Sequence, residues 1–321
     1  MNVLIIKLGA LGDVVMATSL ISAIQKAHPS AKVSLLTSAP FAALFRQWPE
    51  LTVKTTQRRG LWNTRATIRW IRSLQCDRIY DLQSNDRSAV LCALSACRER
   101  VGNHPRYPYT LHPGSRWRGQ SHIYARMIEV LAAANITNVN SVPTLPAGPD
   151  ERDSVNQWLI DNSLSKESFV LLHAGASVTR PKKRWPFFAE LGSRLEALGL
   201  RPVWIGAGAD AKINRELSNG TGGLDASDRF TIIELAELGR HARFAVTNDS
   251  GPMHILSASQ IPVFGLFGPS DWRRNHALGQ ESYAIAGVEC LERYRGSRSA
   301  DCLPDLSCEM VWTKLTQCGV I

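Results

Sequence analysis

The sequence predicts an α/β protein with two domains, each built on a parallel sheet. Short apolar segments typical of buried strands alternate with segments of helical periodicity, as where "NVLIIK" precedes "DVVMATSLISAIQKAHP". The alternation begins again after residue 165, where "FVLLHAG" opens a second strand–helix series. Strands that alternate with helices indicate βαβ units and parallel sheets. We therefore expect one domain over residues 1–165 and another over 166–321, a length sufficient for two domains of ordinary size.

In the first domain, most predicted strands are followed by a predicted helix. Residues 102–120 interrupt this pattern with prolines, glycines, aromatics and arginines, which predicts a long irregular loop. Such loops are uncommon unless they are functional or disordered. A proline-rich linker is expected at 142–150. The strands are expected at 2–7, 31–38, 51–56 and 76–83, and the helices at 13–29, 40–49, 61–74, 87–96, 122–136 and 151–162.

The second domain repeats the same rhythm. Its strands are expected to begin at residues 169, 201, 243 and 261, and its helices to cover 186–199, 231–242 and 250–259. In open parallel sheets, ligands bind where the loops at the carboxyl ends of the strands converge. Two such domains can enclose a cleft that holds one substrate on each side. The candidate site turns are therefore 7–13, 173–183, 206–210, 247–254 and 265–271.

Composition restricts the class of protein. Hydrophobic residues make up 44% and charged residues 20%, as in a globular protein. No segment approaches the roughly 18 consecutive apolar residues of a membrane span, and the N-terminus lacks a signal-peptide pattern. We therefore expect a cytoplasmic protein. The seven cysteines, an odd number, make a full disulfide framework unexpected.

Positive charge is concentrated in one segment. Twelve arginines, four acids and no lysine fall between Arg58 and Arg118, which gives this segment +8 of the chain's net +9. The segment is either an ordinary solvated surface or a surface for an anionic partner such as a phosphorylated lipid, a membrane or nucleic acid. Nucleic acid is the weakest of these alternatives, because the sequence contains no zinc-finger spacing, RNP motif or basic heptad region.

The turn "KLGALGD" is unusual because a carboxylate follows its second glycine. A nicotinamide-binding turn needs G-x-G-x-x-G and an acid at the end of the second strand, and both are missing. The carboxylate of Asp13 would also repel a phosphate at this helix start. Asp13 is either a helix N-cap or a carboxylate that takes a proton from a hydroxyl, and one residue can do both.

The turns of the second domain have the residues that bind a nucleotide. "HAGASVTRPKKRWP" combines a glycine turn with Ser177, Thr179 and Lys183, which suits a diphosphate unless it is only a solvated basic loop. Asp210 follows a strand, where it either binds ribose hydroxyls or only starts a helix. In "TNDSGPMH", Asp249, Ser250 and Gly251 match an anion-binding turn. His254, in the first turn of the following helix, is either a structural histidine or a catalytic one that donates a hydrogen bond to a phosphate or stabilises a leaving group. No H-E-x-x-H or D-x-D motif indicates a metal site.

The chain resembles one known family over nearly all of its length, and four stretches carry the resemblance. "KLGALGDVVMATSLISAI", "HAGASVTRPKKRWPFFAEL", "VTNDSGPMHILSA" and "VFGLFGPSD" are similar, in order and spacing, to the bacterial ADP-heptose:lipopolysaccharide heptosyltransferases, glycosyltransferase family 9. The resemblance implies a GT-B fold, with two Rossmann-like domains facing a central cleft. It implies an N-terminal acceptor-binding domain, a C-terminal nucleotide-sugar-binding domain, and an inverting, metal-independent transfer that uses no cofactor.

The resemblance also implies roles for individual residues. Asp13 falls at the position of the general base, and Asp249, Ser250, Gly251 and His254 match the motif around the diphosphate and sugar. Lys183, with Ser177 or Thr179, falls at the diphosphate. Asp210, a glutamate in many relatives, falls near the ribose, and Phe230 near the adenine. Lys7 stands where many members have arginine.

The implied partners are ADP-heptose and an anionic acceptor, the inner core of lipopolysaccharide, with peripheral contact at the inner face of the inner membrane. The tail "CLERYRGSRSADCLPDLSCEM" resembles a cysteine-containing end seen in part of the family. Its residues Cys290, Cys302 and Cys308 are interpreted as structural, although a metal site or a bridge is an alternative. Other functions remain open: transfer from another nucleotide sugar, a sugar-nucleotide epimerase or hydrolase of the same fold, and a non-catalytic binding module. Epimerase or hydrolase activity would form product without an acceptor.

Overall fold

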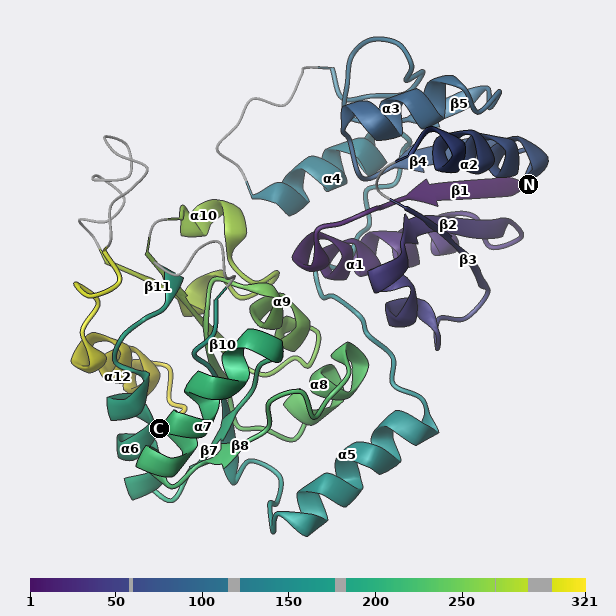
Figure 1. The fold of residues 1–321 in the computed structure, drawn as a ribbon. Helices are drawn as coiled ribbons and strands as arrows, with labels where there is room; N and C mark the ends of the chain where they lie inside the picture. The colour runs from purple at the N-terminus through teal and green to yellow at the C-terminus, as the bar shows by residue number, and fades with distance from the viewer. Residues whose placement is uncertain (58–59, 115–121, 177–182, 269, 288–301) are drawn as a thin grey trace. The chain divides into compact units, whose positions relative to one another are not determined.

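The computed structural model describes residues 1–57, 60–114, 122–176, 183–268, 270–287 and 302–321. They form two compact units, Met1–Pro146 and Ala147–Ile321 (Figure 1). The boundary expected at residue 165 lies within unit 2, between helix α5 (Pro149–Asp161) and strand β6 (Phe169–His173). Helix α5 belongs to unit 2 because Val155, Trp158 and Leu159 pack into its core.

Unit 1 is built on a five-stranded parallel sheet with the strand order β3-β2-β1-β4-β5. Ile5 on the central strand β1 pairs with Leu35 on β2 and with Tyr80 on β4. The elements of unit 1 are β1 (Asn2–Ile6), α1 (Leu11–Ala27), β2 (Lys32–Ser38), the 3₁₀ helix η1 (Ala39–Phe45), β3 (Leu51–Thr56), α2 (Leu61–Ser73), β4 (Arg78–Asp81), α3 (Asp86–Ala93), β5 (Glu99–Val101) and α4 (Ile123–Ala132).

Helices cover the sheet of unit 1. Helix α1 packs with α4, and α2 packs with α3 (Figure 1). Residues 3–6 of β1 are all apolar because this part of the strand is buried on both faces. Leu4 and Ile6 join Ile71 of α2 and Leu91 of α3 in one hydrophobic cluster. This packing holds the carboxyl end of β1, where the predicted turn begins, in a rigid framework.

Unit 2 is built on a six-stranded parallel sheet with the order β11-β10-β9-β6-β7-β8. Besides α5 and β6, its elements are α6 (Phe188–Ala197), β7 (Arg201–Trp204), the 3₁₀ helix η3 (Gly208–Asp210), α7 (Ala211–Thr221), β8 (Leu224–Asp225), α8 (Ile232–Gly239), β9 (Ala245–Asn248), α9 (Gly251–Ser257), β10 (Val263–Phe267), α10 (Trp272–Asn275), the 3₁₀ helix η4 (Glu281–Tyr283), β11 (Ala284–Ala286) and α12 (Cys308–Gln317).

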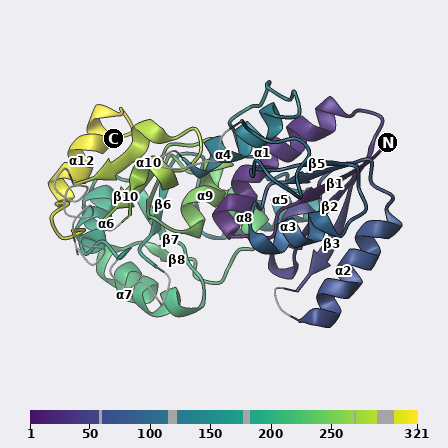
Figure 2. The same ribbon diagram turned by 90° about the horizontal axis from the view of Figure 1, so that it is seen from above.

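The strands of unit 2 send alternate side chains to two separate cores. Val170 and Leu172 of β6 pack on the face covered by α6 and α12, whereas Phe169 and Leu171 pack on the face covered by α5, α8 and α9. Figure 2 shows α6 and α7 on one side of this sheet and α8 and α9 on the other. The period of two along a strand explains why "FVLL" is apolar at every position.

The structure adds short elements that the sequence pattern does not reveal. Strands β5, β8 and β11 have three, two and three residues, too few for a hydrophobic period to be recognised. The helix expected at 40–49 is a 3₁₀ helix, Ala39–Phe45. Among the described residues, no helix is both long enough and apolar enough to cross a bilayer.

We predict that Leu266→Ala destabilises unit 2 by about 2–5 kcal/mol, because Leu266 on β10 is buried and its truncation leaves a cavity. The matched variant Leu198→Ala should change the free energy of unfolding by less than about 0.5 kcal/mol, because Leu198 is 55% exposed. Urea unfolding of both variants measures the difference. Equal effects would contradict the placement of β10 in the core.

Candidate functional site

In both sheets the order in which the chain adds strands reverses at a central pair of parallel strands. In unit 1 the order changes between β1 and β4, and in unit 2 it changes between β9 and β6. At such switch points the loops leave toward opposite faces of the sheet and create a binding crevice at the carboxyl ends of the strands. The turns after β1, β4, β6 and β9 should therefore contain the functional residues of each unit.

Asp13 lies in the first turn of α1, directly after β1. Its Oδ2 atom is 3.5 Å from Nζ of Lys7, and its side chain is 24% exposed. The N-cap of α1 is Ala10, and no side chain caps the helix, so the N-cap interpretation of Asp13 is wrong. Its negative charge still interacts favourably with the helix dipole. The carboxylate of Asp13 is therefore accessible and held beside a cation.

Lys7 is almost completely buried beneath Asp13. Burial lowers the pKa of Lys7, while the neighbouring carboxylates of Asp13 and Asp81 oppose this shift. Its Nζ atom also donates a hydrogen bond to the carbonyl oxygen of Leu82 at 3.3 Å. Lys7 was not among the predicted site residues. Its position directly after β1, in the same turn as Asp13, could have indicated it.

The turn after β4 holds the turn after β1 in place. Oε1 of Gln83 accepts hydrogen bonds from the backbone N–H groups of Leu8, at 2.8 Å, and Gly9, at 3.1 Å. Oδ1 of the buried Asp81 accepts from the N–H groups of Gln83 and Ser84. Gly9 has a φ of +150°, which disfavours other residues. Sequence reasoning missed Gln83, whose role depends on a contact between distant segments.

Lys183 and Asp249 form an ion pair in unit 2, at the ends of the turns after β6 and β9. Their side chains are 14% and 10% exposed, respectively. Oδ2 of Asp249 also accepts a hydrogen bond from Oγ of Ser270, at 2.5 Å. Residues from three separate turns of the sheet edge therefore meet at one carboxylate. The sequence predicted Lys183 and Asp249 but not Ser270.

The buried side chain of Asn248 connects these turns. Its Nδ2 atom donates to the carbonyl oxygens of Ala174 and Gly175, and its Oδ1 atom accepts from the N–H group of Trp185. Since a buried amide is costly unless its hydrogen bonds are satisfied, this arrangement defines the path of the chain on both sides of 177–182.

Asp210, His173 and Ser250 form a second connected group. Nε2 of His173 is 3.5 Å from Oδ2 of Asp210, and Nδ1 is 3.1 Å from Oγ of Ser250. Burial opposes the ionisation of Asp210, but His173, the N–H group of Ala207 and the charge of Arg184 outweigh it and lower the pKa of this carboxyl. His173 was not predicted as a site residue, because a single histidine at the end of an apolar strand also fits a core position.

The remaining predicted residues have different environments. Ser250 precedes α9 and Gly251 is its first residue, while His254 lies one turn later and its side chain is buried. The ring of Phe230 packs edge-on against Trp158 of α5, with a centroid distance of 5.1 Å. Ser177 and Thr179 lie outside the described residues.

Two of the three cysteines interpreted as structural lie in the described part of the chain. Cys302 is in a disulfide, Cys308 is a buried free thiol, and Cys290 lies outside the described residues. Burial raises the pKa of the Cys308 thiol to about 11. In the described part of the chain, no group of three or more His, Cys, Asp or Glu residues is arranged to hold a metal ion.

Comparison with known proteins identifies the family. The sequence model of glycosyltransferase family 9 (heptosyltransferase) matches residues 64–299. Lipopolysaccharide heptosyltransferase 2 of Escherichia coli K12 is 24% identical, with 94% of this chain and 92% of the relative covered.

Solved structures show the same fold. A family 9 glycosyl transferase from Veillonella parvula has a TM-score of 0.84 at 21% identity, with 98% of this chain and 96% of the other covered. E. coli ADP-heptose lps heptosyltransferase II has a TM-score of 0.74 at 21% identity, with coverages of 99% and 98%. The two-unit α/β architecture is thus the GT-B fold, and the chain belongs to glycosyltransferase family 9, the heptosyltransferases.

Proposed function

We propose that this glycosyltransferase transfers a heptose from ADP-heptose to the inner core of lipopolysaccharide, with inversion and without a metal ion. The observation that carries the proposal is the accessible carboxylate of Asp13, held beside Lys7 at the switch point of unit 1. Two E. coli relatives, a lipopolysaccharide heptosyltransferase and an ADP-heptose lps heptosyltransferase, support the choice of donor and acceptor.

Asp13 acts as the general base in this proposal. Its carboxylate takes the proton of the acceptor hydroxyl while the hydroxyl oxygen bonds to the anomeric carbon of the donor. The bond between that carbon and the diphosphate oxygen breaks, and ADP leaves with the bonding electrons. Attack from the face opposite the leaving group inverts the anomeric centre. Lys7 and Gln83 position the turn and do not react.

The residues of unit 2 hold the ADP and stabilise the charge that develops on it. Lys183, the N–H groups of Ser250 and Gly251, and His254 are assigned to the diphosphate, with Ser177 or Thr179 as further donors. Asp249 orients Lys183 through their ion pair. Preorganised donors of this kind can stabilise a leaving phosphate without a divalent cation. Asp210 is assigned to the ribose hydroxyls and Phe230 to the adenine.

An anionic, membrane-associated acceptor fits the surface of α2. Trp62, Arg65, Arg69 and Arg72 are all exposed, and their spacing places them on one face of the helix. The guanidinium of Arg65 lies over the ring of Trp62 at 5.5 Å. A row of arginines beside an exposed tryptophan suits peripheral contact with anionic lipid at the cytoplasmic face of the inner membrane.

The first prediction of this proposal concerns Asp13→Asn. We expect kcat to fall by about 10²- to 10⁴-fold, because the amide cannot take the proton, while ADP binding stays near the wild-type level. The rate of ADP release from ADP-heptose measures kcat. The assay is run with and without acceptor, to detect hydrolysis, and with EDTA, to test the independence from metal ions. Asp150→Asn, in the first turn of α5, is the matched control. Unimpaired transfer by Asp13→Asn would remove the base assignment, and acceptor-independent product would indicate an epimerase or hydrolase.

The second prediction concerns the nucleotide. We expect ADP to raise the melting temperature of the protein, and UDP and GDP to leave it unchanged. Lys183→Met should weaken ADP binding by about 10- to 100-fold, because one charged hydrogen bond to the diphosphate is lost. Lys166→Met is the control, since Lys166 is 71% exposed. A shift with UDP or GDP instead of ADP would overturn the donor assignment.

The third prediction concerns Asp210→Asn. Because the folded-state pKa of Asp210 is lowered, its ionised form stabilises the fold above the ordinary aspartate pKa, and this stabilisation is lost as the pH falls through the folded value. The variant should be less stable than the wild type at pH 7, and the difference should begin to narrow below about pH 4. Urea unfolding across this range, with the exposed Asp161→Asn as the control, tests it. A pH-independent difference would contradict the ionic role.

A further inference from the structure

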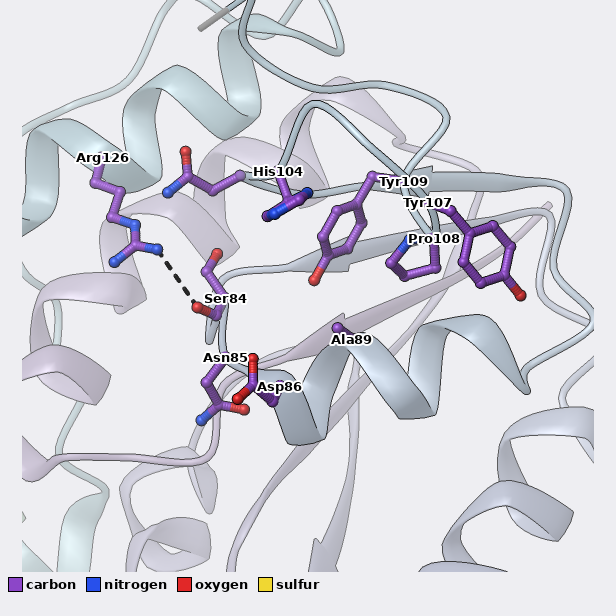
Figure 3. A pocket seen from close by; sticks show the side chains of 10 residues that line it. Ser84, Asn85, Asp86, Ala89, His104, Tyr107, Pro108, Tyr109 and Arg126 are labelled. Atoms are coloured by element: carbon purple, nitrogen blue, oxygen red, sulfur yellow. Dashed lines mark hydrogen bonds between the residues drawn. The ribbon is translucent and has the colours of Figure 1, made fainter. Parts of the chain in front are cut away.

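Unit 1 contains a cavity of about 260 Å³ between the turn after β4, helix α4 and the loop at 103–109. Figure 3 shows Ser84, Asn85 and Asp86 on one side of it, His104 and Tyr109 opposite, and Arg126 at one end. Ligand pockets in proteins commonly measure about 300–1,000 Å³, so this cavity suits a small ring better than a nucleotide. None of its lining residues was assigned a role above.

One wall of the cavity, the 103–109 loop, is anchored to the sheet at Tyr109. The phenol of Tyr109 donates a hydrogen bond to Oδ2 of the buried Asp81, and burial raises the pKa of this phenol. Gly102 permits this placement, because a Cβ atom there would lie 2.3 Å from the ring of Tyr109. The irregular loop is therefore anchored to the sheet, and the cavity is preformed.

Arg126 is held in a defined orientation at the end of the cavity. Its Nη2 atom donates to the carbonyl oxygen of Ser84 at 3.4 Å, the contact drawn in Figure 3. With the side-chain amide of Asn103 turned so that its oxygen faces the guanidinium, this oxygen accepts from Nη2 at 2.9 Å and from Nε. Restrained guanidinium groups are well suited to directional hydrogen bonding.

The charges and polar groups of the cavity favour a neutral sugar. The guanidinium of Arg126 is balanced by the carboxylate of Asp86, which would repel a phosphate or carboxylate ligand. A sugar ring carries hydroxyl groups that both donate and accept, so it can use a carboxylate, an amide and a guanidinium together. Nδ1 of His104 is buried and has no hydrogen-bond partner among the described residues. Because buried polar atoms are usually hydrogen-bonded, a ligand in the cavity could supply the missing partner.

An aromatic residue at the rim of the cavity offers an apolar surface to a sugar ring. Tyr107, at the rim, is 74% exposed, and tyrosine offers both an apolar face and a hydroxyl. Such a ring can cover the C–H face of a pyranose while its neighbours bind the hydroxyls.

The cavity adjoins the turn that holds Asp13. Ser84 directly follows Gln83, whose side chain binds the backbone at Leu8 and Gly9. Burial is the main cause of the lowered pKa of Lys7, and the charge of Arg126 adds a smaller contribution in the same direction. A ligand in the cavity would therefore lie next to the turn after β4, which holds the turn that leads to Asp13.

We propose that this cavity is a subsite for one neutral pyranose ring of the acceptor, recognised by Asp86, Asn85 and Arg126 and covered by Tyr107. That the ring belongs to the acceptor rests on the proposed transferase function, whereas the binding of a sugar ring in the cavity does not. The site positions the acceptor saccharide beside Asp13. It takes no part in proton transfer, so its residues affect acceptor binding and not the chemical step.

The test measures sugar binding to the full-length protein by saturation-transfer NMR and calorimetry. The probes are methyl α-mannopyranoside and a methyl heptopyranoside as neutral rings, and methyl glucuronide and mannose 6-phosphate as charged rings. We expect the neutral rings to bind more tightly. Tyr107→Ala, Asp86→Asn and Arg126→Gln should each weaken this binding about tenfold. Asp150→Asn and Glu129→Gln, both exposed and outside the cavity, are the matched controls.

Kinetics with a lipopolysaccharide-core acceptor then separate this inference from the proposed function. We expect the three variants to raise the acceptor KM about tenfold, with kcat and the donor KM near the wild-type values. Sugar binding by a wild type that transfers nothing from ADP-heptose would overturn the proposed function and leave the subsite standing. Absence of binding, equal binding by all variants, or tighter binding of the charged rings would overturn the subsite.

Discussion

Parallel strand pairing is the constraint on which both groups of polar residues depend. Because all strands of each sheet run in one direction, every strand ends at the same edge, and the following turns converge there. The order of strands then decides which turns become neighbours. The pairing of β1 with β4 brings Gln83 to Leu8 and Gly9, and the pairing of β6 with β9 brings Ser250 to His173.

Buried polar side chains maintain these turns. Asp81 binds the backbone of the turn after β4 and the phenol of Tyr109, and Asn248 binds three backbone groups near β6 and α6. A buried polar group without a partner costs about 1–3 kcal/mol, so each side chain strongly favours the single loop conformation that satisfies it. The turn that leads to Asp13 is thereby held, through Gln83, by the buried Asp81.

Charge is distributed differently over three parts of the protein. The exposed face of α2 is uniformly positive, the cavity beside Asp86 and Arg126 is balanced, and the turns of unit 2 combine Lys183 and Arg184 with Asp210 and Asp249. These three environments suit an anionic surface, a neutral sugar and a nucleotide diphosphate, respectively. The same chain therefore presents three surfaces of different charge, each placed by a different part of the fold.

The sequence by itself determined the α/β class, the two sheets and the positions of Asp13, Lys183, Asp210 and Asp249, because hydrophobic periodicity and turn composition are local properties. It did not determine the roles of Lys7, Gln83, His173 or Ser270, nor the cavity formed by residues 84–86, 103–109 and 126. These features depend on contacts between segments far apart in the chain. Burial, strand order and hydrogen-bond partners exist only after the strands have paired, so only the tertiary structure could decide them.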